Sequence, residues 1–267
     1  MKPEIKTFQK KIYDFFKDNR RDFPWRNTTD PYSIMVSEVM LQQTQTSRVV
    51  EKYLSFIKSF PDTKTLAGAT FPEVLSLWQG LGYNRRTLYL KKAGDIVINE
   101  LGGIFPTDQI SLTKLPGIGT NTAGAIVAFA YNKPVVFIET NIRRVFIHEF
   151  FNDATEVSDK EILPLIQASL PDRDIRNWYY ALMDYGAHLP KVTVNPNRKS
   201  KHYAVQSKFQ GSVRQVRGKI LKVLLENPSS FSELKQQIES SHVKKALEQL
   251  INEGFIEKNG DLLQLKS

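Results

Sequence analysis

The chain has 267 residues, a formal net charge of +9 and no cysteine. Its length suits one or two domains with a sizeable core. Without cysteine it can form no disulfide, no thiolate zinc site and no cysteine-ligated iron–sulfur cluster. The positive charge favours a polyanionic partner such as nucleic acid.

No apolar run reaches the roughly 18 residues that a membrane span requires. The first residues, "MKPEIKTFQKKIYDFF", also lack the apolar region and cleavage site of a signal peptide. We therefore expect a cytoplasmic protein that makes no use of a membrane.

Helical periodicity dominates the first part of the chain. In residues 3–19 apolar side chains recur at three- and four-residue spacings, which predicts an amphipathic helix with one buried stripe. No strand pattern of useful length interrupts the helices, so this part should be all-α. Further helices are predicted at residues 47–60, 72–79, 84–100, 121–131, 141–150, 159–169 and 176–186.

A second helix is predicted to begin with Asp30 as its N-cap and Pro31 at its first position. We expect it to continue through "SEVMLQQTQ". On one helix, Glu38, Gln42 and Gln45 would share a side because they are four and three residues apart. This would place one acid beside several uncharged amide groups.

The composition changes after residue 190. Residues 191–212 are rich in lysine and arginine and contain no acid, which indicates either a solvated linker or a strap that contacts phosphates. Three helical segments and a hairpin around Asn259 and Gly260 follow, in the order of a winged helix. We predict a helical domain at 1–190, a basic linker at 191–212 and a winged-helix-like domain at 213–267.

The motif "LPGIGTNTAGAIVAFA" begins at Leu115 and indicates a helix-hairpin-helix. Glycines in such a turn let backbone amides approach a phosphate closely, and the following helix adds its N-terminal dipole. An ordinary glycine-containing turn between helices is the alternative interpretation.

Residues 8–190 resemble the MutY-type adenine-DNA glycosylases of the helix-hairpin-helix base-excision superfamily. The resemblance implies an all-α, two-lobed body. One lobe would hold the first helix and the chain after about Glu139, and the other lobe the residues between. The motifs that carry it, in order, are "FPWR", "DPY", "SEVMLQQTQ", "LWQGLGYNRR", "GGIFP", "LPGIGTNTAGAI" and "MDYGA".

The resemblance implies two catalytic carboxyl groups. Glu38 would protonate the departing adenine, and burial would raise its pKa so that it holds a proton near neutral pH. Met35, Val39 and Met40 are candidates for the apolar surroundings. Glu139 stands where the family has an aspartate, and it would stabilise the positively charged sugar.

A set of residues is predicted to contact DNA. A glycosylase that extrudes a nucleotide must fill the gap left in the duplex. By resemblance Gln43 inserts there, and Tyr83 wedges beside the opposite base. The full set is Arg26, Leu41, Gln42, Gln43, Tyr83, Leu115, Gly117, Gly119, Asn121, Thr122, Arg214 and Arg217.

Three departures from the family pattern have consequences. Asn121 occupies the position where bifunctional relatives carry lysine, so we predict a monofunctional enzyme without strand-cutting activity. The iron–sulfur loop is absent, and no cofactor is expected, although the hairpin carbonyls could hold a monovalent cation. By the same comparison, we expect the chain to lack the domain that reads 8-oxoguanine in classical members.

The sequence thus predicts a monofunctional DNA glycosylase of base-excision repair. It would act as a monomer on double-stranded DNA and remove adenine mispaired with guanine or 8-oxoguanine. A thymine or uracil mismatch glycosylase is one alternative. A catalytically inactive DNA-binding protein on the same scaffold is another.

Overall fold

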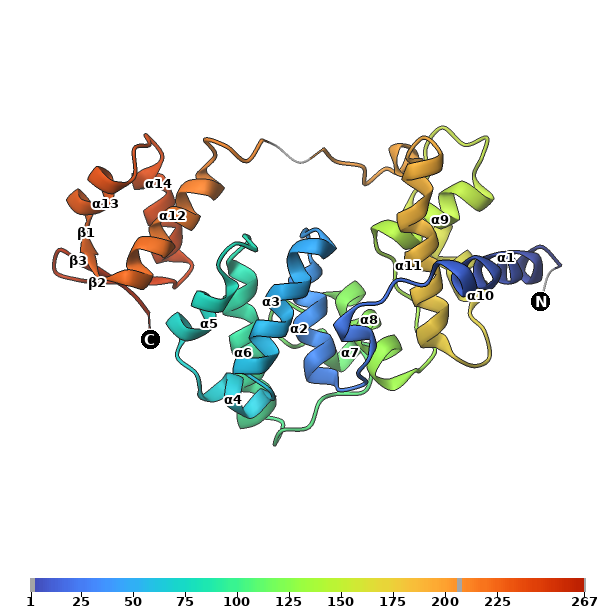
Figure 1. Ribbon diagram of the computed structural model, residues 1–267, viewed down its shortest axis with the longest axis horizontal. Coiled ribbons are helices and arrows are strands. Elements are labelled where there is room, and N and C mark those ends of the chain that lie inside the picture. The colour runs from blue at the N-terminus through green and yellow to red at the C-terminus, as the bar shows by residue number, and fades with distance from the viewer. Residues whose placement is uncertain (1–2, 206–207, 267) are drawn as a thin grey trace. The chain divides into compact units, whose positions relative to one another are not determined.

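The computed structural model describes residues 3–205 and 208–266, which are mainly helical (Figure 1). Internal contacts divide the chain into two units. The described residues of Met1–Glu38, Phe105–Lys114 and Ile118–Val205 form the first unit, and those of Val39–Ile104, Leu115–Gly117 and Gln206–Ser267 form the second. The predicted fold class is confirmed: the chain is mainly helical, and its small C-terminal segment combines helices with short strands.

The first unit contains helices of 4 to 18 residues, one of which, α2, ends with three residues of the second unit. Their bounds, with two 3₁₀ turns, are α1 (Pro3–Asn19), η1 (Pro24–Arg26), α2 (Pro31–Leu41), α7 (Gln109–Leu112), α8 (Thr120–Tyr131), α9 (Thr140–Phe150), α10 (Asp159–Ser169), α11 (Ile175–Val192) and η2 (Pro196–Lys199).

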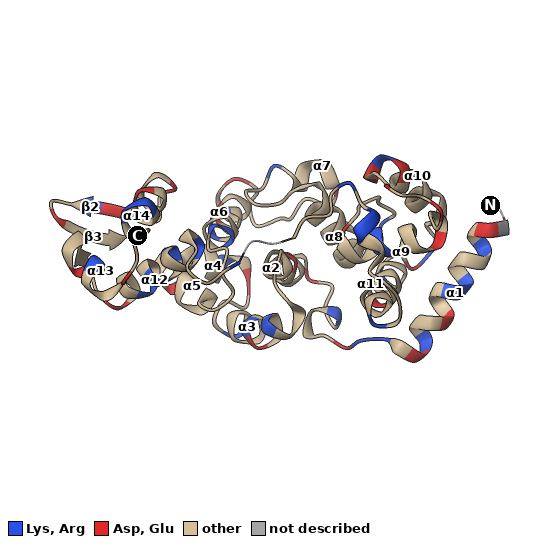
Figure 2. Ribbon diagram, turned by 90° about the horizontal axis from the view of Figure 1, so that it is seen from above, with Lys and Arg blue, Asp and Glu red and all other residues tan. Residues whose placement is uncertain are grey.

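Helix α11 forms the centre of this unit, packed against α9 and α1 (Figure 1). The ring of Phe8 in α1 meets Trp178 of α11 and Phe146 of α9 edge-on, with centroids 5.8 and 5.3 Å apart. All three side chains are buried, so the apolar stripe predicted for α1 is confirmed. Basic and acidic residues are interspersed along the rest of α1 (Figure 2).

Helices α9 and α11 approach each other closely because Gly186 has no side chain. A Cβ atom at Gly186 would lie 2.3 Å from the carbonyl oxygen of Asn141 at the start of α9. Such a distance is shorter than any allowed contact, so only glycine permits this packing.

Helix α8 also belongs to the first unit, which corrects the expected division at Glu139. Its small residues let it lie buried, and a Cβ at Gly124 would be 2.5 Å from Cβ of Phe137. Phe129 stacks on Tyr180 of α11 with centroids 4.5 Å apart. These contacts join α8 to α11, so most of the chain from Phe105 onward packs with the first unit.

The second unit combines four central helices with the C-terminal segment. Its elements are α3 (Thr46–Ser59), α4 (Thr63–Gly68), α5 (Phe71–Trp78), α6 (Arg85–Asn99), α12 (Val213–Glu226), β1 (Ser229–Ser230), α13 (Phe231–Gln237), α14 (Val243–Asn252), β2 (Ile256–Asn259) and β3 (Leu262–Leu265).

The C-terminal segment has the helix and strand order of a winged helix, as predicted. Its antiparallel strands lie in the order β1-β3-β2, with Ile256 opposite Leu265 and Ser229 opposite Leu263. Gly260 has φ +63°, the left-handed conformation that the hairpin turn requires. The domain boundaries predicted at 190 and 212 stay predictions.

The predicted helix through "SEVMLQQTQ" is wrong in its second half. Asp30 does cap α2, because its Oδ2 accepts a hydrogen bond from the backbone N–H of Ser33 at 2.8 Å. The helix ends at Leu41, and Gln43 has φ +55° in the turn that follows. Glu38 and the glutamines therefore do not share one helix face.

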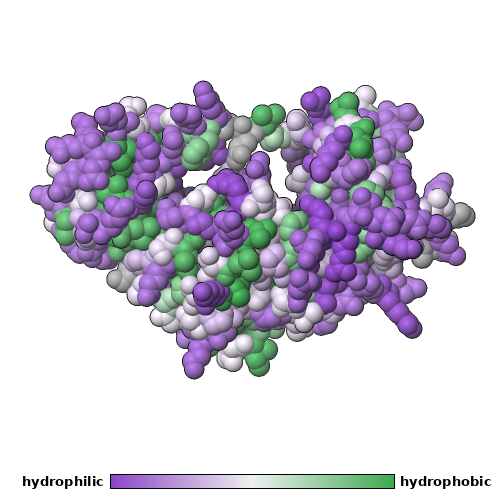
Figure 3. Space-filling view, viewed as in Figure 1, coloured by the Kyte–Doolittle hydropathy of each residue, from purple (hydrophilic) through white to green (hydrophobic). Residues whose placement is uncertain are grey.

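Hydrophilic side chains cover most of the molecular face in Figure 3. None of the helices within residues 3–205 and 208–266 combines the length and apolar character needed to cross a membrane.

Candidate active site

Glu38 lies on a helix that is otherwise almost wholly buried. Ile34, Met35 and Ser37 are at most 1% exposed, while Glu38 keeps part of its accessible surface. Burial raises the pKa of Glu38 to about 8, the negative charge of Glu139 acts in the same direction, and Arg26 opposes both. A carboxyl group with such a pKa holds its proton at neutral pH and can donate it.

Glu139 is the N-cap of α9. Its Oε1 accepts hydrogen bonds from the backbone N–H groups of Asn141 at 2.8 Å and Ile142 at 2.9 Å, and its Oε2 accepts one from the Asn141 side chain at 3.2 Å. The pKa of Glu139 is raised overall because burial outweighs the backbone donors and the charges of Arg144 and Arg143, which act in the opposite direction. Donors stabilise the ionised form of a carboxyl group. Of the two acids, Glu139 is therefore the one whose carboxyl group is held in place by hydrogen-bond donors at a helix N-terminus.

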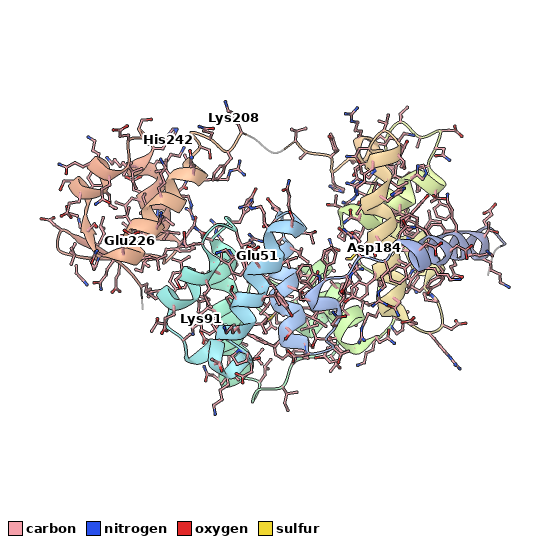
Figure 4. All side chains as sticks on the ribbon, viewed as in Figure 1. Glu51, Lys91, Asp184, Lys208, Glu226 and His242 are labelled. Carbon is pink, nitrogen blue, oxygen red and sulfur yellow. The ribbon has the colours of Figure 1, made fainter. Side chains whose placement is uncertain are left out.

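Asp184, labelled on α11 in Figure 4, is the centre of a buried ion cluster. Arg26 donates through Nη1 and Nη2 to both oxygens of Asp184, at 2.8 and 2.7 Å. Arg21 adds a bond from Nε at 2.6 Å and one from its backbone N–H at 3.0 Å. The side chains of Arg26 and Asp184 are only 3% and 1% exposed.

Arg26 is almost wholly buried, so the structure lends no support to its predicted contact with DNA, which stays a prediction. Its guanidinium lies 4.4 Å from the ring centroid of Tyr180, and its charge lowers the pKa of Glu38. The role that the structure gives Arg26 is electrostatic: it limits how far burial and Glu139 raise the pKa of Glu38.

Two residues of this site were missed by the sequence reasoning. Asp184 is one, although a lone acid among apolar residues of a helix needs a cationic partner. Arg144 is the other: its Nη1 donates to the carbonyl of Gly186 at 2.6 Å and to the side chain of Asn141 at 3.0 Å. Arg144 thus joins α9 to α11 and acts on Glu139 through its charge, and no local sequence pattern indicates this role.

Asn121 is the second residue of α8, where bifunctional relatives carry lysine. Its Oδ1 accepts a hydrogen bond from the backbone N–H of Ile138 at 3.2 Å. The side chain therefore holds the segment that leads into Glu139. Thr122, the next predicted contact, is partly exposed.

The predicted helix-hairpin-helix is present as α7, a glycine turn and α8. Gly117 has φ +76°, and a Cβ there would lie 2.8 Å from Cβ of Tyr89, so this position needs glycine. Gly119 is the N-cap of α8. The side chain of Leu115 is buried, so contacts of this turn with DNA would come from its backbone.

The turn that carries Gln43 is held by one buried arginine. Arg86 donates from Nη1 to the carbonyls of Val39 and Met40, both at 2.8 Å, and of Gln42 at 2.6 Å. The carbonyls of Val39 and Met40 lie in the last turn of α2, where they have no partner within the helix, and that of Gln42 follows the helix. Arg86 therefore ends the helix and fixes the turn, leaving Gln43 exposed.

The same arginine reaches the loop that carries Tyr83. Its Nη2 donates to the carbonyl of Gly82 at 2.9 Å and to Oγ1 of Thr44 at 3.0 Å. Burial lowers the pKa of Arg86 to about 10. One guanidinium thus joins the two turns that hold the residues predicted to enter the duplex.

Two remaining predicted contacts bind protein groups. Arg214 donates to the hydroxyl of Tyr83 at 2.8 Å. Arg217 donates through both terminal nitrogens to Glu253, at 2.9 and 2.6 Å. A phosphate contact by Arg217 is therefore not supported. Leu41 and Gln42 are partly exposed, and Gln42 donates to the carbonyl of Gly117 at 3.4 Å.

Comparison with known proteins identifies the family. Residues 36–168 match the HhH-GPD superfamily of base excision DNA repair proteins. An adenine DNA glycosylase of Mycolicibacterium smegmatis is 30% identical over 271 residues, which cover 94% of this chain and 92% of that protein. The chain belongs to the adenine DNA glycosylase family of this superfamily. A Buchnera aphidicola member (strain Bp) is 35% identical over 198 residues, and only 56% of its length is covered.

Solved structures agree with the fold of this glycosylase family. A thermostable thymine-DNA glycosylase matches with a TM-score of 0.64 and 27% identity, over 73% of this chain and 92% of the other. A non-covalent endonuclease III–DNA complex matches with a TM-score of 0.60 over 72% and 89% of the two chains. At 18% identity, that second match supports the fold alone.

Proposed function

We propose that this protein is a monofunctional DNA glycosylase that hydrolyses the N-glycosidic bond of adenine mispaired with guanine or 8-oxoguanine. The observation that carries the proposal is the pair of Glu38 and Glu139. One carboxyl has a pKa of about 8, and the other is held by N–H donors of a helix N-terminus. Two acids whose surroundings differ in this way suit an acid and a charge stabiliser.

The reaction begins with proton transfer from Glu38 to N7 of the extruded adenine. The electron pair of the bond between C1′ and N9 then moves into the base, which leaves as neutral adenine. The sugar is left as an oxocarbenium ion, and the carboxylate of Glu139 stabilises its positive charge. Water adds to C1′ and returns a proton to Glu38.

The glutamate at 139 replaces the aspartate of the family pattern. Its additional methylene moves the charge by about an ångström, a displacement that can cost on the order of a hundredfold in rate. In this chain the carboxylate is bound to the backbone of Asn141 and Ile142, so it has a defined position despite its length. This support favours Glu139 as the residue that acts on the sugar.

The proposed substrate is double-stranded DNA, bound by a monomer in the cytoplasm. Gln43 and Tyr83 lie on turns joined by Arg86, and both have positive φ. We expect them to fill the gap left by the extruded adenine. No iron–sulfur cluster is expected because the chain has no cysteine. A monovalent cation at the hairpin stays a proposal.

The test is single-turnover base release from labelled duplexes that contain A:8-oxoG, A:G, T:G or U:G. Alkali then cuts each abasic site. Glu38→Gln and Glu139→Gln should each abolish adenine release, while Glu51→Gln, a substitution of an exposed acid on α3, should not change it. Release of thymine or uracil instead would support the mismatch pyrimidine alternative. Binding without any release would leave a DNA-binding protein.

The absence of lyase activity has its own test. Asparagine has no amine that could attack C1′ and form a Schiff base. Borohydride should therefore trap no covalent complex with the wild-type protein. Strand cleavage without alkali, or a trapped complex, would contradict the monofunctional assignment and would direct the search to another amine.

A further inference from the structure

The loop that carries Tyr83 has an unusual backbone. Gly80 and Gly82 have φ +92° and +74°, and Tyr83 itself has φ +47°. A tyrosine adopts this left-handed conformation only when its surroundings hold it there. The contacts of the Tyr83 side chain and of its neighbours therefore decide how this loop presents the ring.

The C-terminal segment supplies one of these contacts. Nη1 of Arg214, in the first turn of α12, donates to the hydroxyl of Tyr83 at 2.8 Å. The Arg214 guanidinium also lies 5.8 Å from the ring centroid of Tyr83. A charged donor makes a stronger hydrogen bond than a neutral one. The hydroxyl end of the Tyr83 ring is thus held by a residue that is more than 130 positions away in sequence.

A second contact joins the same two segments. Glu253, after α14, accepts hydrogen bonds at 2.6 Å from Nη2 of Arg85 and at 2.6 Å from Nη2 of Arg217. Burial raises the pKa of Glu253, but the hydrogen bonds from Arg85 and Arg217 outweigh this effect and lower it. Arg85 follows Tyr83 by two residues, and Arg217 lies about one helical turn after Arg214.

Beneath these polar contacts, one apolar core extends from α5 and α6 into the C-terminal segment. Phe71 and Leu75 of α5 and Leu88 of α6 belong to the same buried cluster as the core of α12 to β3. The rings of Phe71 and Phe255 meet edge-on, with centroids 5.6 Å apart. The C-terminal segment is therefore packed on α5 and α6 and can act as a fixed support for the loop between them.

We propose that the winged-helix-like segment is part of the mismatch-reading machinery. Arg214 is a positioning residue for Tyr83, and the ion pairs of Glu253 with Arg85 and Arg217 hold α12 in place for that task. By positioning Tyr83, this segment affects how the protein recognises the base opposite the excised adenine. This inference rests on the proposed function, because that function gives Tyr83 its place in the duplex.

The experiment is a double-mutant cycle with Arg214→Ala, Tyr83→Phe and the combined variant. Lys222→Ala is the matched control, since it removes one positive charge from an exposed position of the same helix. Rates of adenine release are measured for A:8-oxoG and A:G. Dissociation constants are measured for a duplex with a tetrahydrofuran abasic analogue opposite guanine.

Each single variant should lose about tenfold in rate, and the combined variant should be no worse than either, because both remove the same contact. The ratio of the A:8-oxoG rate to the A:G rate should change, which a loss of general stability would not cause. Arg214→Lys should recover part of the loss. Glu253→Gln should change the ratio in the same direction, since it acts through α12.

Multiplicative losses in the combined variant, or an unchanged ratio, would overturn the proposal. Faster release by Arg214→Ala would also overturn it, since Arg214 would then restrain Tyr83 rather than position it. If the wild-type protein releases no adenine, the proposed function fails, and the binding cycle still decides whether Arg214 acts through Tyr83. Thermal unfolding of each variant identifies any that fails to fold.

Discussion

Protonation of Glu38 should make the stability of the protein depend on pH. The pKa of this carboxyl is about 8 in the folded protein, against an ordinary value of 4.5. Because the folded pKa is raised, the stabilising contribution is fully present below pH 4.5 and is lost as the pH rises through 8. One pKa unit corresponds to about 1.4 kcal/mol, so the loss is about 3 kcal/mol at pH 7 and at most about 5 kcal/mol above pH 8.

Glu38→Gln should remove this dependence, because an amide of similar size does not ionise. We expect the free energies of unfolding of the variant and the wild type to differ by less than about 1 kcal/mol at pH 5, close to the ordinary pKa of the carboxyl group. At pH 9 the variant should be more stable by several kcal/mol, on the order of 3–5. Urea unfolding from pH 5 to 9, followed by tryptophan fluorescence, measures the difference, since Trp25 and Trp178 are buried in the same unit.

The control is Glu51→Gln, which should leave the pH dependence of the wild type intact. A stability difference between Glu38→Gln and the wild type that stays constant from pH 5 to 9 would refute the reasoning. The pH dependence of the rate of adenine release is an independent test of the pKa of Glu38. It should fall as the pH rises through about 8, since only the protonated form of Glu38 donates.

Three substitutions test the packing. Gly186→Ala places a Cβ against the carbonyl of Asn141 and should destabilise the protein by more than about 3 kcal/mol, measured by thermal unfolding. Gly218→Ala, at a helical position with open space, should stabilise by about 0.5–1 kcal/mol in the same assay. Asp184→Asn leaves Arg26 buried without its anion and should cost about 3–5 kcal/mol in urea unfolding; a cost below 1 kcal/mol would contradict the ion cluster.

The sequence predicted the helical elements well because their signals are local. The apolar spacing in α1, the cap at Asp30 and the glycine turn of the hairpin each depend on residues within a few positions. The same holds for the turn at Gly260. For each of these, the structure agrees with the prediction to within a residue or two.

The errors arose where distant residues decide the local structure. The end of α2 depends on Arg86, more than 40 residues away, which takes the carbonyls that a longer helix would have used. The burial of Arg26 could not be predicted, because its partner Asp184 lies 158 residues away in sequence. The same limit explains why α8 was assigned to the other lobe.

The candidate site was predicted in part. Glu38 and Glu139 were named from the resemblance, and in the structure the negative charge of Glu139 helps to raise the pKa of Glu38. The difference between their surroundings, on which their proposed roles depend, comes from tertiary contacts, namely the helix N-terminus at Asn141 and the cation of Arg26. Neither could be read from spacing.

The buried guanidinium of Arg86 has a consequence for how selectivity can evolve. One side chain binds both the Gln43 turn and the Tyr83 loop, so the spacing between these two loops is fixed by the protein and does not depend on the DNA. A substitution that shifts one loop must shift the other or leave a buried charge with fewer hydrogen-bond partners. New substrate preferences should therefore arise by changing side chains on the two loops, while the arginine beneath them stays in place.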